Sequence, residues 1–325
     1  MAMDISEVYP GMIFSLAARM AFTKYCLILI CLTAASAKPA SDLSTHAGEF
    51  STAALHATLS AQRAYGMVES VYYRSRVELM ARHYTKDGFE PGSIQPFLSS
   101  QDIQLRLSLL RALRAYAASL GDLTGSKDAD EVDKEAAAIG TSLVNLQSEP
   151  FTQSFAKDVK SSVSADALRA GAAGIGAIGH YLQERRRRKE LPGIIARMQD
   201  AVDGVVQLIV EDIGNGPGKP FPAGNGLRGQ AWISADSLLR DQILFIDGNE
   251  LPAVEKRHEI EKLAAIDEER RSTDAALAAV QSTLQKLSKA HRALLTSDQH
   301  PASFQAVIGE LEAEGAHIAV VMKGQ

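Results

Sequence analysis

The sequence predicts an all-α protein, folded as an elongated helical bundle with two long coiled-coil-like helices. Three observations support this fold class. Residues that favour helices, such as Ala, Leu, Glu, Gln and Arg, dominate the 325 residues, whereas alternating runs of β-branched residues are absent. Apolar residues recur at steps of three and four along most of the chain. Two of these patterns each extend over 44 residues, and a helix of that length spans about 66 Å.

The first half of the chain predicts one long helix followed by shorter ones. Residues 41–84 form an alanine-rich pattern with Phe50, Val68 and Val71 on its apolar face, and the glycines and prolines of 88–96 end it. Ser99 or Ser100 is expected to cap the next helix. The further helices expected in this half cover 100–120, 128–146, a short piece after 150, and 164–189.

The second half begins with the clearest amphipathic pattern. After a break at 191–193, the apolar residues of 194–213 lie on one helix face and the acidic residues on the other. Residues 214–229 (GNGPGKPFPAGNGLRG) are too rich in Gly and Pro to continue a helix. The last expected helices cover 231–246, 253–296 and 303–322.

The helix expected over 253–296 carries an apolar seam with the spacing of a coiled coil. We expect the part of the seam from Leu277 to Leu287 to be buried. Arg270 interrupts the seam, so it should either pair with an acidic side chain of a neighbouring helix or mark where the helix leaves the bundle. Because their lengths match, this helix and the first long helix are expected to lie side by side.

The N-terminal residues predict export. Arg19 and Lys24 are followed by a short apolar run and by a small-x-small sequence at 35–37, so residues 20–37 are built like a secretory signal peptide. The uncharged stretch after Lys24 has 13 residues, and a membrane-spanning helix needs about 20. We therefore expect cleavage near Ala37 and a periplasmic or secreted protein.

Cleavage would also remove all thiol chemistry. Cys26 and Cys31 are the only cysteines, and both precede the expected cleavage site. The true start is either Met1 or Met20, because acidic residues precede Met20 where a signal should be basic. We divide the chain into an N-terminal extension with the signal peptide (1–37), a helical region (38–213), a Gly/Pro-rich linker (214–229), and a long-helix region (230–325) that packs with 38–213 as one bundle.

A run of small residues from Gly171 to Gly179 (GAAGIGAIG) allows three interpretations. Its last three glycines match the G-x-G-x-x-G dinucleotide fingerprint, but the strand that this fingerprint requires does not precede them. We favour a second interpretation, in which Gly171, Gly174, Gly176 and Gly179 let two helices approach closely. In the third, residues 164–213 with their basic run at 185–189 insert into a membrane as a hairpin. Burial of 170–182 between helices distinguishes these possibilities.

Two Glu-x-x-His pairs are weak candidates for a metal site. Glu255 and His258 form one pair and Glu314 and His317 the other, and helical di-iron proteins use two such pairs with two further glutamates. The sequence around Glu255 is charged on all sides, and no inward-facing glutamate presents itself as a further ligand. A metal site would require the two pairs to converge.

No catalytic constellation emerges from the sequence, so neither catalytic residues nor a cofactor are expected. A nucleophile elbow and a phosphate-binding loop are both absent from the sequence. The net charge of −5 argues against nucleic-acid binding. We expect an exported, non-enzymatic helical bundle that acts through protein–protein contacts in the cell envelope. The alternatives are a membrane-active protein that uses 164–213 and a metal-dependent helical enzyme.

Overall fold

A computed structural model describes residues 42–82, 84, 94, 96–123, 140–141, 163–184, 191–218 and 225–323. The chain forms two compact units, Met1–Ser41 and Asp42–Gln325, and all described residues belong to the second. The predicted signal peptide (20–37), nearly all of the helix expected at 128–146, the short piece after 150 and the basic run at 185–189 lie outside the described residues.

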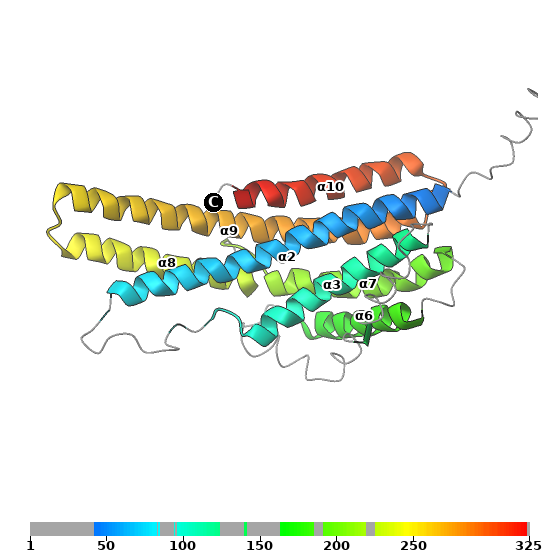
Figure 1. Cartoon of the computed structure of the whole chain (residues 1–325), viewed down its shortest axis with the longest axis horizontal. Helices are drawn as coiled ribbons and strands as arrows, with labels where there is room; N and C mark the ends of the chain where they lie inside the picture. The colour runs from blue at the N-terminus through cyan, green and yellow to red at the C-terminus, as the bar shows by residue number, and fades with distance from the viewer. Residues whose placement is uncertain are drawn as a thin grey trace, which may run out of the picture. The chain divides into compact units, whose positions relative to one another are not determined.

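The described residues form helices and contain no strand, which confirms the predicted all-α class (Figure 1). The pattern of helix breaks follows the glycines and prolines that the sequence places between apolar stripes. The helices are α2 (Asp42–Arg82), α3 (Ser100–Asp122), α6 (Ala165–Glu184), α7 (Leu191–Ile213), α8 (Gly226–Gly248), α9 (Ala253–Leu294) and α10 (Pro301–Lys323).

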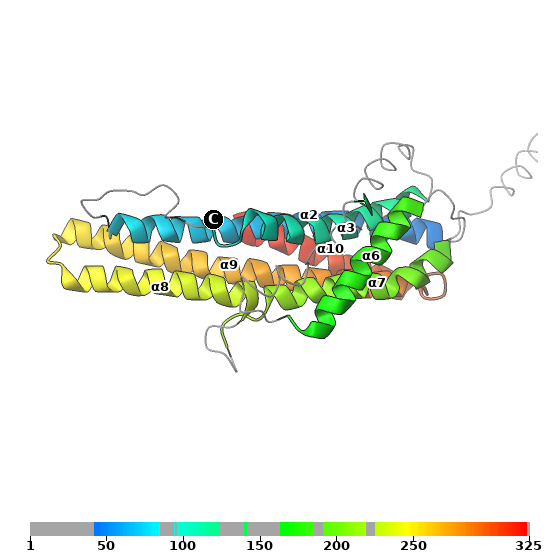
Figure 2. The ribbon, with the colours of Figure 1, turned by 90° about the horizontal axis from the view of Figure 1, so that it is seen from below.

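Helix α9 lies at the centre of the bundle and contacts α2, α7, α8 and α10. Figures 1 and 2 show α8 beside its first half and α10 beside its second half. Helix α2 runs antiparallel to α9, because Arg74 forms an ion pair with Glu269 while Phe50 lies against His291. The expectation that the two long helices lie side by side is therefore confirmed. Whether they supercoil about each other stays a prediction.

The apolar seam of α9 is buried from Leu277 to Leu287, as predicted. Arg270 donates to Asp236 of α8 at 3.1 Å, which confirms that it pairs with an acidic side chain of a neighbouring helix. Its guanidinium also lies 4.1 Å from the ring centroid of Trp232 on α8, within the range of a cation–π contact. Through these contacts Arg270 links α9 to α8, just before the buried part of the α9 seam begins.

The start of α8 corrects the predicted linker boundary. The expected helix began at residue 231, whereas α8 begins at Gly226, inside the stretch assigned to the linker. Tertiary contacts override the low helix propensity of glycine here. Leu227 is fully buried, and Asn215 and Asn225 bond to each other and close the loop between α7 and α8.

Candidate functional site

The small-residue run lies inside a helix contact. Gly171 and Gly174 of α6 face α7, where a Cβ atom on either glycine would come within 2.4 Å of Leu208 or of the Ala201 carbonyl oxygen. Gly204 of α7 meets Ala170 in the same way. At Gly174 and Gly204 the backbone of the other helix leaves no room for a side chain, and at Gly171 the Leu208 side chain fills that space. This geometry supports our favoured interpretation of the run, a close contact between two helices.

The other two glycines of the run are also buried. Gly179 contributes a backbone oxygen that would lie 2.9 Å from a Cβ atom on Gly140, and Gly176 is enclosed as well. Gly176 and Gly179 belong to α6, and the described residues before this helix contain no strand. The strand that a dinucleotide fingerprint requires is therefore missing from that part of the chain. Within the described parts of the chain, no helix is both long and apolar enough to cross a membrane.

The four metal candidates do not converge. Glu255 and His258 are exposed in the first turns of α9. Glu314 instead accepts hydrogen bonds from Ser282 (3.0 Å) and Lys286 (2.9 Å), farther along the same helix. The 27 residues that separate positions 255 and 282 correspond to about 40 Å of helix. Among the residues that the structure describes, no group of three or more His, Cys, Asp or Glu is placed to hold a metal ion.

A buried polar chain, which sequence reasoning missed, crosses the bundle from α3 to α7. His291 of α9 lies between Tyr116 (Oη to Nε2, 2.7 Å) and Gln199 (Nδ1 to Oε1, 2.9 Å). The amide of Gln199 donates to Asp203 at 2.8 Å, so its oxygen faces the imidazole. Nδ1 of His291 therefore carries the proton, and Nε2 accepts from the Tyr116 hydroxyl.

The electrostatics of this chain favour a neutral imidazole. Burial lowers the pKa of His291 to about 4, against the opposing attraction of Asp203. Burial also raises the pKa of Tyr116 well above its usual value. Burial opposes ionisation of Asp203 too, but hydrogen bonds from Ser288, Gln199 and Arg292 bring its pKa below the usual value. Since His291 and Tyr116 are both enclosed in the core, this chain can fix the helices but cannot reach a substrate.

A second buried polar cluster ties α3 to α7. Arg106 donates to both carboxylate oxygens of Asp212 at 2.7 Å, and the two side chains are 1% and 2% exposed. Arg106 also donates to the backbone oxygen of Asp102 at 3.2 Å. Tyr65 of α2 is buried nearby, where burial and the negative charge of Asp212 raise its pKa well above the usual value. Like the first chain, this ion pair is closed to solvent.

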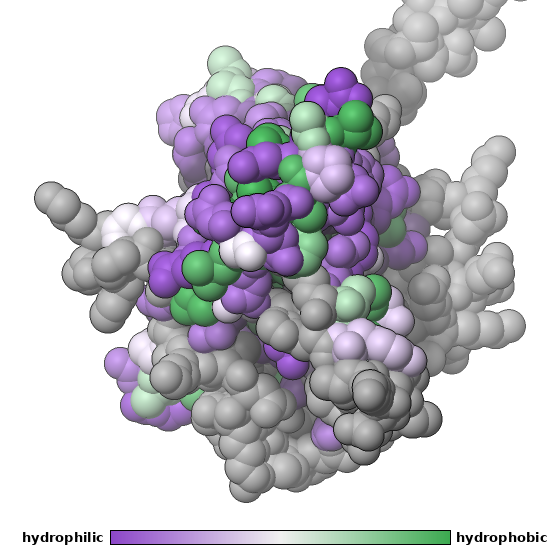
Figure 3. Space-filling model, turned by 90° about the vertical axis from the view of Figure 1, so that its left-hand side faces the viewer, coloured by the Kyte–Doolittle hydropathy of each residue, from purple (hydrophilic) through white to green (hydrophobic). Residues whose placement is uncertain are grey.

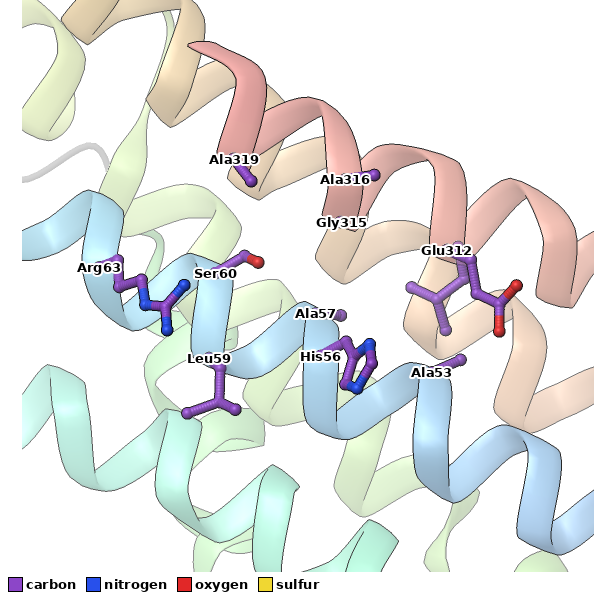
Figure 4. A pocket seen from close by; sticks show the side chains of 11 residues that line it. Ala53, His56, Ala57, Leu59, Ser60, Arg63, Glu312, Gly315, Ala316 and Ala319 are labelled. Atoms are coloured by element: carbon purple, nitrogen blue, oxygen red, sulfur yellow. The ribbon is translucent and has the colours of Figure 1, made fainter. Parts of the chain in front are cut away.

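Hollows of a different kind lie on the surface of the described residues. The first is a groove between α2 and α10 with a volume of about 560 Å³ (Figure 4). His56, Ser60 and Arg63 line it from α2, and Glu312 and Ala316 line it from α10. A second hollow of about 500 Å³ continues the groove toward the start of both helices and shares Glu312 with the first. We call the two together the α2–α10 groove.

The other hollow, which we call the end pocket, has about 300 Å³ and lies where α2, α8 and α9 meet. Tyr73 and Val77 of α2, Leu238 of α8 and Ile266 of α9 give it an apolar lining. Tyr73 is 54% exposed and Val77 38%. Figure 3 shows apolar residues between polar ones on this end of the bundle.

Charged side chains also line the end pocket. Arg74 and Lys262 are basic, and Glu78 and Glu269 are acidic. Arg74 forms an ion pair with Glu269. Partial burial raises the pKa of Glu269, although the charge of Arg74 opposes this shift. The end pocket is therefore an apolar hollow bordered by side chains of both charges.

The comparisons with known proteins give no family to which this site can be assigned: no protein-family model, no curated protein and no solved structure matches the chain.

Proposed function

We propose that this protein is an exported, non-enzymatic helical bundle that binds a protein partner in the cell envelope, and that the end pocket is its contact site. One observation carries the proposal: Tyr73 and Val77 are large apolar side chains that stay substantially exposed beside an apolar hollow. A partner that inserts an apolar side chain there would remove this surface from water, which stabilises the complex by roughly 25 cal/mol for each Å² buried.

The chemistry of the pocket indicates how the partner would be oriented. Tyrosine and arginine are enriched among the residues that dominate protein interfaces, and the pocket places Tyr73 next to Arg74. The charges of Lys262 and Glu78 around the pocket would select a partner of complementary charge. Four further apolar side chains near this end, Ile243, Leu244, Val254 and Ile260, are exposed on α8 and α9 and extend the surface available for contact.

Two features of the core support a role without catalysis. His291, which hydrogen-bonds to Tyr116, is enclosed in the core together with it, and the ion pair of Arg106 and Asp212 is buried too. Gly171 and Gly174 hold α6 against α7, so a membrane-active role would require this contact to open.

A photo-crosslinking experiment tests the proposal. The protein is expressed in its source organism with a photoreactive amino acid at position 77, and cell-envelope fractions are irradiated. We expect one defined crosslinked partner. Placing the same photoreactive residue at Leu295, which is 39% exposed after the end of α9 and lies outside both the end pocket and the α2–α10 groove, serves as the matched control and should not give this product.

The affinity for the crosslinked partner then tests the role of the pocket. Tyr73→Ala should weaken binding by about tenfold or more, which corresponds to at least about 1.4 kcal/mol. Leu295→Ala, at an exposed site outside both hollows, should leave the affinity unchanged. Equal crosslinking from positions 77 and 295, or an unchanged affinity of the Tyr73→Ala variant, would contradict the proposal.

A further inference from the structure

We propose that the α2–α10 groove is the face through which two copies of this chain associate, antiparallel to each other and related by a two-fold axis at His56. This inference goes beyond the proposed partner contact and does not depend on it, because the groove and the end pocket use different parts of α2.

The groove is built from two parallel helices with small residues along its floor. Gln305 of α10 donates to Glu49 of α2 at 2.7 Å, and two to three turns further a Cβ atom on Gly315 would lie 3.7 Å from the Cα atom of Ala57. The two helices therefore keep nearly the same register along the groove. Ala53 and Ala316 line it as well, so another helix can approach both backbones closely.

The outer face of α10 extends this surface. Six small or aliphatic residues follow one another along it at alternating steps of four and three, which is the spacing of a helix–helix seam. All six are exposed to solvent: Ala302, Ala306, Gly309, Ala313, Ala316 and Val320.

The charges on α2 identify the occupant as a second copy. Glu49, His56 and Arg63 line the groove at intervals of seven residues and thus occupy one heptad position. One is acidic, the middle one is a histidine, and the last is basic. In the described part of the chain, Glu49 accepts from the neutral amide of Gln305, and neither Glu49 nor Arg63 forms an ion pair.

A two-fold axis at His56 makes this pattern complementary to itself. Antiparallel packing of α2 on α2 places Glu49 of each copy opposite Arg63 of the other, so two ion pairs form, and each histidine meets its equivalent. A parallel arrangement would place like charges together, which is unfavourable. Isologous interfaces of this type are the commonest in homodimers.

Charge reversal tests the orientation. In sedimentation experiments on the full chain carrying Cys26→Ser and Cys31→Ser, we expect a dimer. Glu49→Arg and Arg63→Glu should each weaken association at least tenfold, and the double variant should restore it, because the two ion pairs re-form with reversed charges. Arg197→Glu, a reversal at an exposed site of α7, is the control and should leave the dimer unchanged. Circular dichroism establishes that every variant is folded.

Cysteine crosslinking tests the position of the axis. His56→Cys in the same cysteine-free chain should form an intermolecular disulfide on oxidation with copper phenanthroline. His258→Cys, exposed on α9, should not. A wild-type protein that stays monomeric at all accessible concentrations would overturn the proposal. So would a double charge variant that associates no better than the single variants, or a failure of the cysteine at position 56 to crosslink.

Discussion

Replacing Gly174 by alanine tests the close contact between α6 and α7. A new Cβ atom would lie 2.4 Å from the backbone oxygen of Ala201 and 3.0 Å from a methyl group of Val205. The oxygen belongs to the helix backbone and cannot rotate away, so α6 and α7 must move apart. Overpacking of this kind costs about 1–3 kcal/mol, and the better helix propensity of alanine returns about 1 kcal/mol.

Gly66→Ala provides the matched control. Gly66 lies inside α2, and a Cβ atom there would meet nothing within 4 Å. The substitution should therefore stabilise the protein by about 1 kcal/mol through propensity alone. Urea denaturation followed by circular dichroism measures both variants. We expect the free energy of unfolding of Gly174→Ala to lie about 1–3 kcal/mol below that of Gly66→Ala.

Equal stabilisation by the two substitutions would refute the argument from close backbone approach. Liposome leakage measured on the same samples addresses the membrane alternative. A Gly174→Ala variant that keeps its stability in solution and gains leakage activity would indicate that this face of α6 meets lipid rather than α7.

Four further outcomes are expected. Leu284→Ala should cost about 2–5 kcal/mol in chemical denaturation, because Leu284 is fully buried in the α9 seam; stability equal to wild type would contradict the seam. Arg106→Met alone should destabilise by about 3–5 kcal/mol, since it leaves the charge of Asp212 buried without its partner, whereas adding Asp212→Leu should recover most of the loss; equal stability of the two variants would contradict this. The pKa of His291 is about 4 in the folded protein, below its value in the unfolded chain, so unfolding takes up a proton at acidic pH. The free energy of unfolding should therefore fall by about 3 kcal/mol, relative to His291→Gln, as the pH drops from about 6.5 to about 4. Parallel pH profiles of the two proteins in urea unfolding would refute this. N-terminal sequencing of the exported protein should begin at Lys38, and a full-length membrane-retained chain would show that residues 1–37 are not a cleaved signal.

Local sequence patterns predicted the helices of this protein well. The described bounds of α2, Asp42–Arg82, and of α9, Ala253–Leu294, lie within two residues of those expected. Ser99 caps α3 by accepting from the backbone nitrogen of Asp102. Capping, helix periodicity and the breaks at glycine and proline involve residues close in sequence, so they can be predicted from the sequence without knowledge of the packing.

The contacts between helices could be predicted only in part. The sequence indicated that Gly171 and Gly174 suit a close helix contact, but the residues that they meet on α7 follow from the packing of two helices. The heptad spacing of Glu49, His56 and Arg63 is readable in the chain, yet only the neighbouring α10 turns this stripe into a groove.

By itself, the sequence determined that the protein is helical, where most of its helices end, and which face of each helix is apolar. Only the tertiary structure decided which polar groups meet in the core. Tyr116 and His291 are separated by 175 residues and His291 and Gln199 by 92, so no spacing along one helix connects them. Because these polar side chains come from α3, α9 and α7, their hydrogen bonds arise only where three helices converge and water is excluded.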